Sequence, residues 1–110
     1  MERRANPLRG EVPLTLGGRV YVLRPSFAAI VAVEQRLGGV IALAVKGSKG
    51  ELGLREMAAL IFETMEKDGS GAPSEEEVGA LILEEGLAAI SPVVSALLAA
   101  ILKGGRQTDS

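Results

Sequence analysis

EVPLTLGGRVYVLR, residues 11–24, is the stretch that decides the fold of the N-terminal part of the chain. Two short apolar runs flank Gly17 and Gly18, and a pair of glycines supplies the positive φ angles that a tight two-residue turn requires. The spacing predicts a β-hairpin over 10–24 in which Leu16 faces Arg19. Pro13 has no amide hydrogen, so the amide edge at that position should face outward. One face of the hairpin is apolar enough to need a cover, and it carries Val12, Leu14, Leu16, Tyr21 and Leu23.

After the hairpin, apolar residues recur along the chain with the spacing of α-helices. Ser26 is a predicted N-cap, and Ser74 with Glu77 forms a capping box, the best local signal in the sequence. The predicted elements are a helix over 27–37, a short apolar turn over 40–45, a loop over 47–50, and helices over 54–67, from Ser74 to Gly86, and over 87–102. We therefore predict a mainly α fold in which an N-terminal β-hairpin is followed by a small bundle of about four to five helices.

The 110 residues suit one domain and are too few for two. We expect a single helical domain over 10–102, which includes the hairpin. A flexible arm is predicted over 1–9 and a mobile polar tail over 103–110, because both stretches are polar.

The last predicted helix, 87–102, is the most hydrophobic element. It is roughly four residues short of a membrane span, and it contains two serines and a proline, so we do not predict a transmembrane segment. Pro92 predicts a kink, or a new start with Ser91 as the cap. The broad apolar side of this helix serves the core alone, or the core and an oligomer interface; it carries Val94, Leu97, Leu98, Ile101 and Leu102.

The composition argues against catalysis. The chain has no histidine and no cysteine, so it lacks the commonest general base, the commonest metal ligand and any thiol chemistry. The Gly47-Ser48-Lys49-Gly50 turn does not have the spacing of a phosphate-binding loop. We therefore expect no enzyme, no metal site, no cofactor and no small-molecule substrate.

Charge is distributed unevenly along the chain. Residues 1–49 carry eight basic and three acidic side chains, whereas residues 50–102 carry two basic and ten acidic ones. One interpretation is that each half has a solvent-exposed face with its own sign of charge. The other is that the asymmetry serves head-to-tail self-association or the binding of a partner of complementary charge. Nucleic acid is a poor candidate partner, because the acidic half would repel phosphates.

Several stretches carry a resemblance to known proteins: residues 6–14, 16–19 and 21–27 with Ile30 and Glu34, and later residues 74–78, 85–87 and 97–100. Together they resemble the gene transfer agent family. These are small tail proteins of alphaproteobacterial prophages and phage-like gene transfer particles, and they are usually classed with phage tail assembly chaperones. The resemblance covers about residues 6–102 and is most specific in its first third.

The resemblance implies a tail assembly chaperone in the bacterial host cytoplasm. Such a protein binds the tape-measure protein, and in some cases tail-tube subunits, during tail morphogenesis. One alternative is a structural minor tail or tail-tube component, although a tube subunit should build larger sheets than one hairpin. A second alternative is a small helical regulatory module that binds nucleic acid.

We expect a partner to bind the hairpin face and the last helix. A homo-oligomer is a further possibility, and no membrane partner is expected. Surplus aliphatic surface can cover another polypeptide reversibly. The candidate residues are Leu14, Leu16, Tyr21, Leu23, Val94, Leu97, Leu98 and Ile101.

Overall fold

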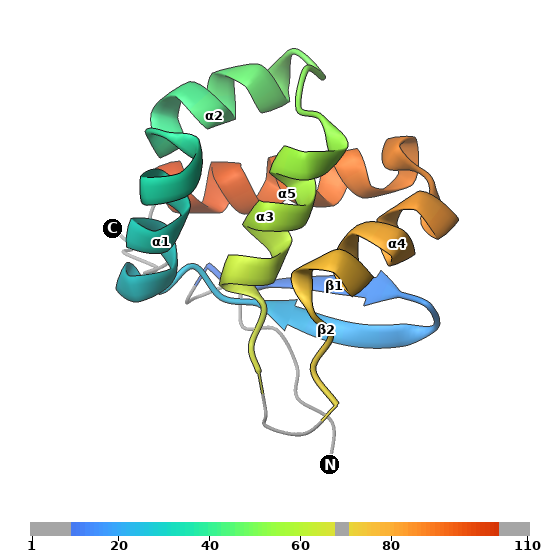
Figure 1. Cartoon of the computed structure of the whole chain (residues 1–110). Coiled ribbons are helices and arrows are strands. Elements are labelled where there is room, and N and C mark those ends of the chain that lie inside the picture. The colour runs from blue at the N-terminus through green and yellow to red at the C-terminus, as the bar shows by residue number, and fades with distance from the viewer. Residues whose placement is uncertain (1–9, 68–70, 104–110) are drawn as a thin grey trace.

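The computed structural model describes residues 10–67 and 71–103 (Figure 1). A two-stranded antiparallel sheet precedes five helices, as the sequence predicts. The elements are β1 (Val12–Leu16), β2 (Arg19–Leu23), α1 (Phe27–Leu37), α2 (Val40–Ser48), α3 (Leu54–Thr64), α4 (Glu75–Glu85) and α5 (Leu87–Lys103). The predicted arm over 1–9 lies outside the described residues. So does the predicted tail, except for Lys103, which is the last residue of α5.

The hairpin has the predicted register. Leu16 pairs with Arg19, and the turn residues Gly17 and Gly18 have φ angles of +58° and +79°. Both angles lie in the left-handed region that glycine adopts without steric cost, so the two glycines fix the register and with it the side chains that face the helices.

The outer edge of β2 is partly covered by the chain that leaves α3. The Arg24 N–H donates to the Thr64 carbonyl at 2.6 Å, and the Glu66 N–H donates to the Val22 carbonyl at 2.8 Å. The helix predicted over 54–67 is therefore too long. It ends at Thr64, because the backbone becomes extended at Met65 and bonds to the sheet instead.

The core lies between the hairpin and the helices, with α3 at its centre. α3 packs against α1, α4 and α5, and the hairpin lies beneath the helices in Figure 1. The most deeply buried large side chains come from nearly every element and are Leu16, Leu23, Val33, Leu60, Ile61, Val78, Ile82, Val94, Leu97 and Leu98. The aliphatic residues of the sequence therefore form one continuous core.

α2 is longer than the sequence predicts. The expected apolar turn over 40–45 and part of the expected loop over 47–50 form one helix of nine residues. A Cβ atom at Gly47 would lie 3.2 Å from Cδ1 of Leu98 and 3.3 Å from Cδ1 of Leu52. Gly47 thus sits inside the helix, where it allows α2 to approach α5 closely, and the sequence suggested a loop only because glycine usually marks one.

Helix ends confirm the predicted caps. The Ser26 hydroxyl accepts the Ala29 N–H at 3.2 Å, and Ser74 and Glu77 form the reciprocal capping box. α5 runs through Pro92 as one helix that begins directly after Gly86, so of the two alternatives predicted at Pro92, a kink or a new start capped by Ser91, the new start is wrong.

Candidate functional site

Seven large apolar side chains are exposed among the described residues: Val20, Phe27, Ile41, Val45, Leu83, Leu87 and Leu102. Single exposed apolar residues are common, but a group of them on neighbouring elements marks an interaction surface. Three of the seven lie on α1 and α2, which follow each other at an angle of 75° across Gly38 and Gly39. We call the exposed apolar residues of these two helices, Phe27, Ile41, Ala42 and Val45, the α1–α2 face; Phe27 lies at the beginning of α1, the end of that helix farther from α2.

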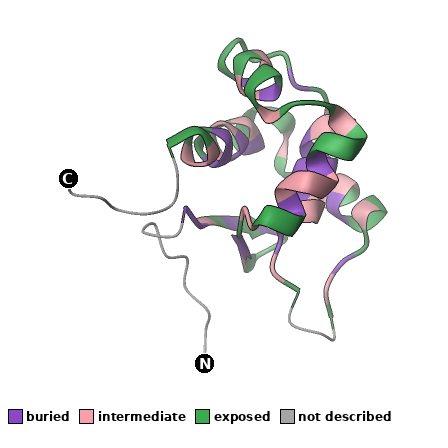
Figure 2. Ribbon diagram, turned by 90° about the vertical axis from the view of Figure 1, so that its left-hand side faces the viewer, coloured by how far each residue is buried: buried purple, intermediate pink, exposed green. Residues whose placement is uncertain are grey.

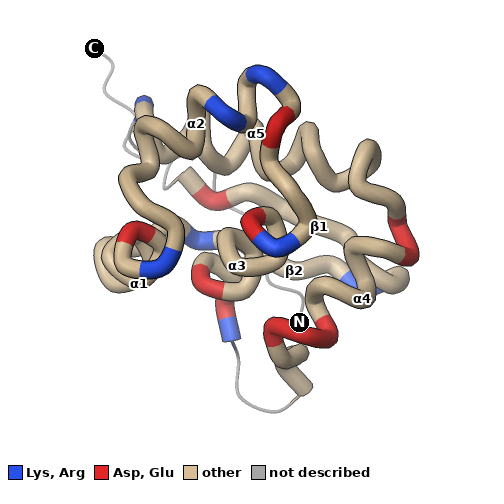
Figure 3. The backbone as a smooth tube through the Cα atoms, turned by 45° about the horizontal axis from the view of Figure 1, so that its top comes forward, with Lys and Arg blue, Asp and Glu red and all other residues tan. Residues whose placement is uncertain are grey.

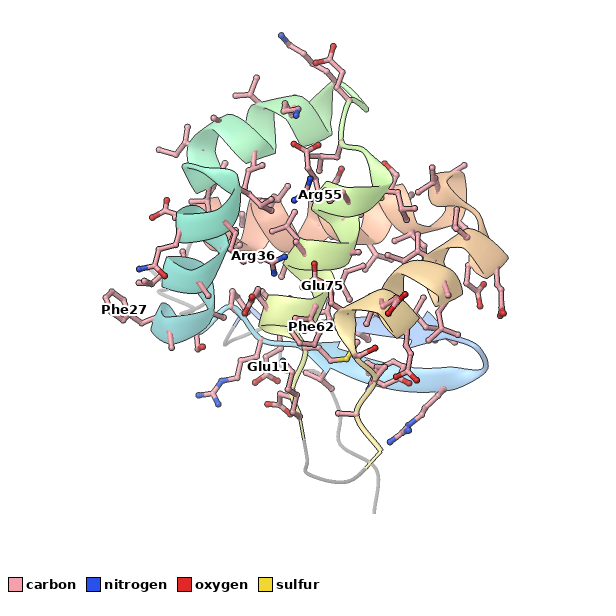
Figure 4. All side chains as sticks on the ribbon, in the orientation of Figure 1. Glu11, Phe27, Arg36, Arg55, Phe62 and Glu75 are labelled. Atoms are coloured by element: carbon pink, nitrogen blue, oxygen red, sulfur yellow. The ribbon has the colours of Figure 1, made fainter. Side chains whose placement is uncertain are left out.

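Phe27 is the most exposed of these side chains, at 86%. The buried side of α1 carries Ala29 and Val33, which lie on the opposite side of the helix from Phe27. Figure 4 shows the Phe27 ring pointing away from the body of the molecule at the beginning of α1. The ring is therefore available as a large apolar anchor for a partner.

α2 contributes an apolar outer side. Ile41 is 68% exposed, and Ala42 and Val45 are exposed beside it. Leu43 and Gly47 are the buried residues of this helix, and α2 packs on α5 through that side. In Figure 2 most of the α2 ribbon has the colours of exposed and intermediate residues. α2 is thus an apolar helix that buries one side and exposes the other.

Two charged contacts hold α2 in place. The Lys46 ammonium lies 2.6 Å from a Glu56 carboxylate oxygen, and the Val40 N–H donates to the Glu34 carboxylate at 3.0 Å. The hydrogen bond from Lys46 lowers the pKa of Glu56 below its ordinary value, and a hydrogen bond from the Gly53 N–H has a smaller effect in the same direction. These contacts fix the ends of α2, so its apolar outer side is presented in one orientation.

Arg36 connects α1 to two other helices. Its guanidinium donates to Glu63 of α3 at 2.9 Å and to Glu75 of α4 at 2.7 Å. These bonds raise the pKa of Arg36, and the bond to Arg36 lowers the pKa of Glu75. Figure 4 shows Arg36 and Glu75 pointing toward one another, and Figure 3 shows acidic residues on both α3 and α4. The contact anchors the helix that carries Phe27.

Most of the partner-binding residues predicted from the sequence face the core. Tyr21 and Ile101 are partly exposed, and the Arg19 guanidinium lies 5.3 Å from the centre of the Tyr21 ring. Whether any of the predicted residues contacts a partner stays a prediction. Six of them are buried in the folded chain, namely Leu14, Leu16, Leu23, Val94, Leu97 and Leu98.

The α1–α2 face is not among the surfaces predicted from the sequence. Phe27 has helical spacing with Ile30 and Leu37, which suggested one buried stripe. The signal that could have found the face is the composition of the segment over 40–48, which is apolar on all sides and has one charged residue. Such a segment has more apolar surface than a helix at the edge of a small domain can bury.

The described residues contain no group of three or more potential metal ligands.

No single helix in 10–67 and 71–103 is long and apolar enough to cross a membrane. Two bent helix pairs, α1 with α2 and α4 with α5, meet the length and composition test together.

The comparison with protein families identifies the group to which the chain is related. A family model described as phage tail tube protein, GTA-gp10, matches residues 9–104. The chain belongs to this family. No curated protein and no solved structure matches it. Membership in the GTA-gp10 family confirms a gene transfer agent or phage tail protein, and the family description agrees better with a tail component than with an assembly chaperone.

Proposed function

We propose that this GTA-gp10 family protein is a structural component of a phage or gene transfer agent tail, held there by contacts with other tail proteins. The observation that carries the proposal is the α1–α2 face, where Phe27 and Ile41 expose most of their apolar surface. The family description supports the tail as its place of action.

The α1–α2 face suits protein contact more than any other role. Removing exposed apolar area from water is favourable by about 25 cal/mol per Å², from which the entropy cost of association is subtracted, and a few large side chains supply most of the binding energy in an interface. The protein acts without catalysis or a cofactor, and it meets its partners in the host cytoplasm while particles are assembled.

Tail assembly chaperone is the second candidate, and the fold favours it. Each strand of the single hairpin has five residues, which is little sheet from which to build a tube wall. In the chaperone role, the α1–α2 face covers an amphipathic helix of the tape-measure protein and releases it when the tail matures. The two candidates differ in whether the protein remains in the finished particle.

The experiment follows a tagged chain through assembly. Finished tails are purified, and the number of copies per tail is measured by quantitative mass spectrometry. A constant, stoichiometric number supports the structural role. Absence from finished tails, together with a soluble complex on co-expression with the tape-measure protein, supports the chaperone instead.

Matched variants test the surface itself. Phe27→Ser and Ile41→Ser change exposed side chains, so both proteins should fold, which circular dichroism checks. Both should reduce incorporation or complex formation at least tenfold, whereas the exposed and polar Gln35→Ser on α1 should not. Unchanged binding by both apolar variants would overturn the assignment of the face.

A further inference from the structure

Glycines stand at both ends of α2. Gly38 and Gly39 separate it from α1, and Gly50 follows its last turn. Gly38 and Gly50 have φ angles of +95° and +68°, and a Cβ atom added at either position would meet nothing within 4 Å. Neither glycine is held by packing, and glycine has access to more backbone conformations than any other residue. Both connections of α2 can therefore change direction without disturbing the core.

Few side chains of α2 are buried in the core. Leu43 and Gly47 are its buried residues, and they lie one turn apart on the side that packs on α5. Gly47 lies close to α5, since an added Cβ would be 3.2 Å from Cδ1 of Leu98. Val40 and Ala44 are partly buried beside them. One fully buried aliphatic side chain and one close glycine thus make most of the apolar contact between α2 and the core.

An ion pair at the surface connects α2 to α3. The Lys46 ammonium and the Glu56 carboxylate lie 2.6 Å apart, and 44% and 25% of their side chains are exposed. At the other end of α2, the Val40 N–H donates to the exposed Glu34. Because water and salt reach both contacts, each of them holds α2 only weakly.

α2 is too short to remain a helix by itself. Isolated helices of fewer than about 12–15 residues are marginal in water, and α2 has nine residues, one of which is a glycine. Its N-cap residue, Gly39, offers no side-chain hydrogen bond to the first turn. An α2 segment that leaves α5 therefore loses its helical hydrogen bonds as well.

We infer that α2 is a separately folding unit, which undocks from α5 and unfolds locally while the rest of the chain stays folded. Ile41 and Val45 belong to the α1–α2 face only while α2 is docked. A partner that covers this face, as in the proposed function on which this step rests, therefore selects the docked state and holds α2 on α5. The face can thus be formed or dissolved without unfolding of the core.

Amide hydrogen exchange of the free chain tests the undocking. The hydrogen-bonded amides of α2 should exchange at least about tenfold faster than those of Leu60 and Ile61 in α3, after correction for the intrinsic rate of each residue. Low concentrations of urea should hardly change the α2 rates and should raise the α3 rates steeply, because local opening exposes little surface. Equal rates with equal urea dependence would show that α2 opens only with the whole fold, and would refute the inference.

Substitutions at the ion pair test what holds α2 docked. Lys46→Met and Glu56→Gln each remove the pair, and glutamine keeps an oxygen for the Gly53 N–H, which donates to Glu56 at 3.0 Å. Each variant should speed α2 exchange about two- to fivefold, and the double variant should speed it no further. Lys49→Met removes a charge at the end of the same helix and leaves the pair intact, so it should not change the rate. Multiplying effects in the double variant, or an equal effect of Lys49→Met, would exclude the ion pair as the hold.

Exchange in the bound state tests the effect of a partner. In a complex with the tape-measure protein, or in finished tails, α2 exchange should be at least about tenfold slower than in the free chain. Faster exchange would show that the partner replaces α2 on α5, and an unchanged rate would show that it binds elsewhere. Either result would contradict selection of the docked state.

Failure of this inference is separable from failure of the proposed function. The undocking is measured on the free chain, without any partner. Equal exchange rates in α2 and α3, in a chain that still enters tails or binds the tape-measure protein, would refute the undocking alone. Fast local exchange in a chain that does neither would refute the proposed function and leave the undocking in place.

Discussion

α2 and α3 show that the apolar character of a helix does not decide its burial. α2 carries one charged residue, Lys46, and buries two of nine residues, whereas α3 carries three charged residues and buries six of eleven. The more apolar helix is therefore the more exposed one. The difference arises from position, because α3 packs against three other helices and α2 lies at the edge, on α5 and the end of α1.

The comparison separates apolar residues that hold the fold from apolar residues that remain available. In α3 the buried set includes Leu60 and Ile61, both fully buried. In α2 the exposed set includes Ile41 and Val45, whose burial must come from another molecule if it comes at all. Four predictions test this division, from the largest effect on stability to the smallest.

Leu60→Ala should lower the free energy of unfolding by about 2–5 kcal/mol. The side chain is fully buried at the centre of the core, so its removal leaves a cavity that the surrounding helices fill only in part. Urea unfolding followed by circular dichroism measures the change. Leu60→Met, which conserves most of the volume, should cost less than about 1.5 kcal/mol. A loss below 1 kcal/mol for Leu60→Ala would contradict the central place of α3.

Gly47→Val should cost about 1–3 kcal/mol, because a side chain there would press on Leu98 and Leu52 and push α2 away from α5. Gly79→Ala is the control, since the added Cβ would lie 3.9 Å from the Ala58 Cβ in ordinary contact. Replacement of a mid-helix glycine should raise stability by about 0.5–1 kcal/mol. Thermal unfolding of both variants compares them. Equal effects would show that Gly47 does not set the approach of α2.

Lys46→Met should cost about 1 kcal/mol or less, because both partners of the ion pair with Glu56 are partly exposed to solvent. The pKa of Glu56 is lower in the folded chain than in the unfolded one. The pair therefore contributes above the unfolded pKa of about 4, and its contribution is lost as the pH falls through the folded pKa. The difference in stability between the two proteins should shrink from pH 7 to pH 3. A constant difference would assign it to packing of the lysine stem.

The sequence predicted what short-range chemistry decides. The hairpin register follows from Gly17 and Gly18 alone, and the beginnings of α1 and α4 follow from Ser26 and Ser74. Each of these signals acts within four residues, so no knowledge of the rest of the fold is needed.

The exposed faces could not be predicted, because they depend on packing between distant segments. The burial of Val94 and Leu97 requires knowing that α5 packs against α2 and β1, and the exposure of Phe27 requires knowing which side of α1 meets α3. The position of Gly47 inside α2, and not in a loop, could not be predicted for the same reason. The predicted partner residues are mostly large aliphatic ones, and those are the residues whose burial stabilises the folded chain itself.

A matched pair within α2 gives the smallest effect on stability and the sharpest test of the division. Ile41→Ser should change the free energy of unfolding by no more than about 0.5 kcal/mol, because the side chain is 68% exposed and the two residues have similar helix propensities. Leu43→Ser, two residues later, removes a buried side chain and should cost several times more. Both proteins are compared by urea unfolding at a concentration where the chain is monomeric. If the two variants lose equal stability, the outer side of α2 is covered in the folded monomer, and its apolar residues are then no longer free for a partner.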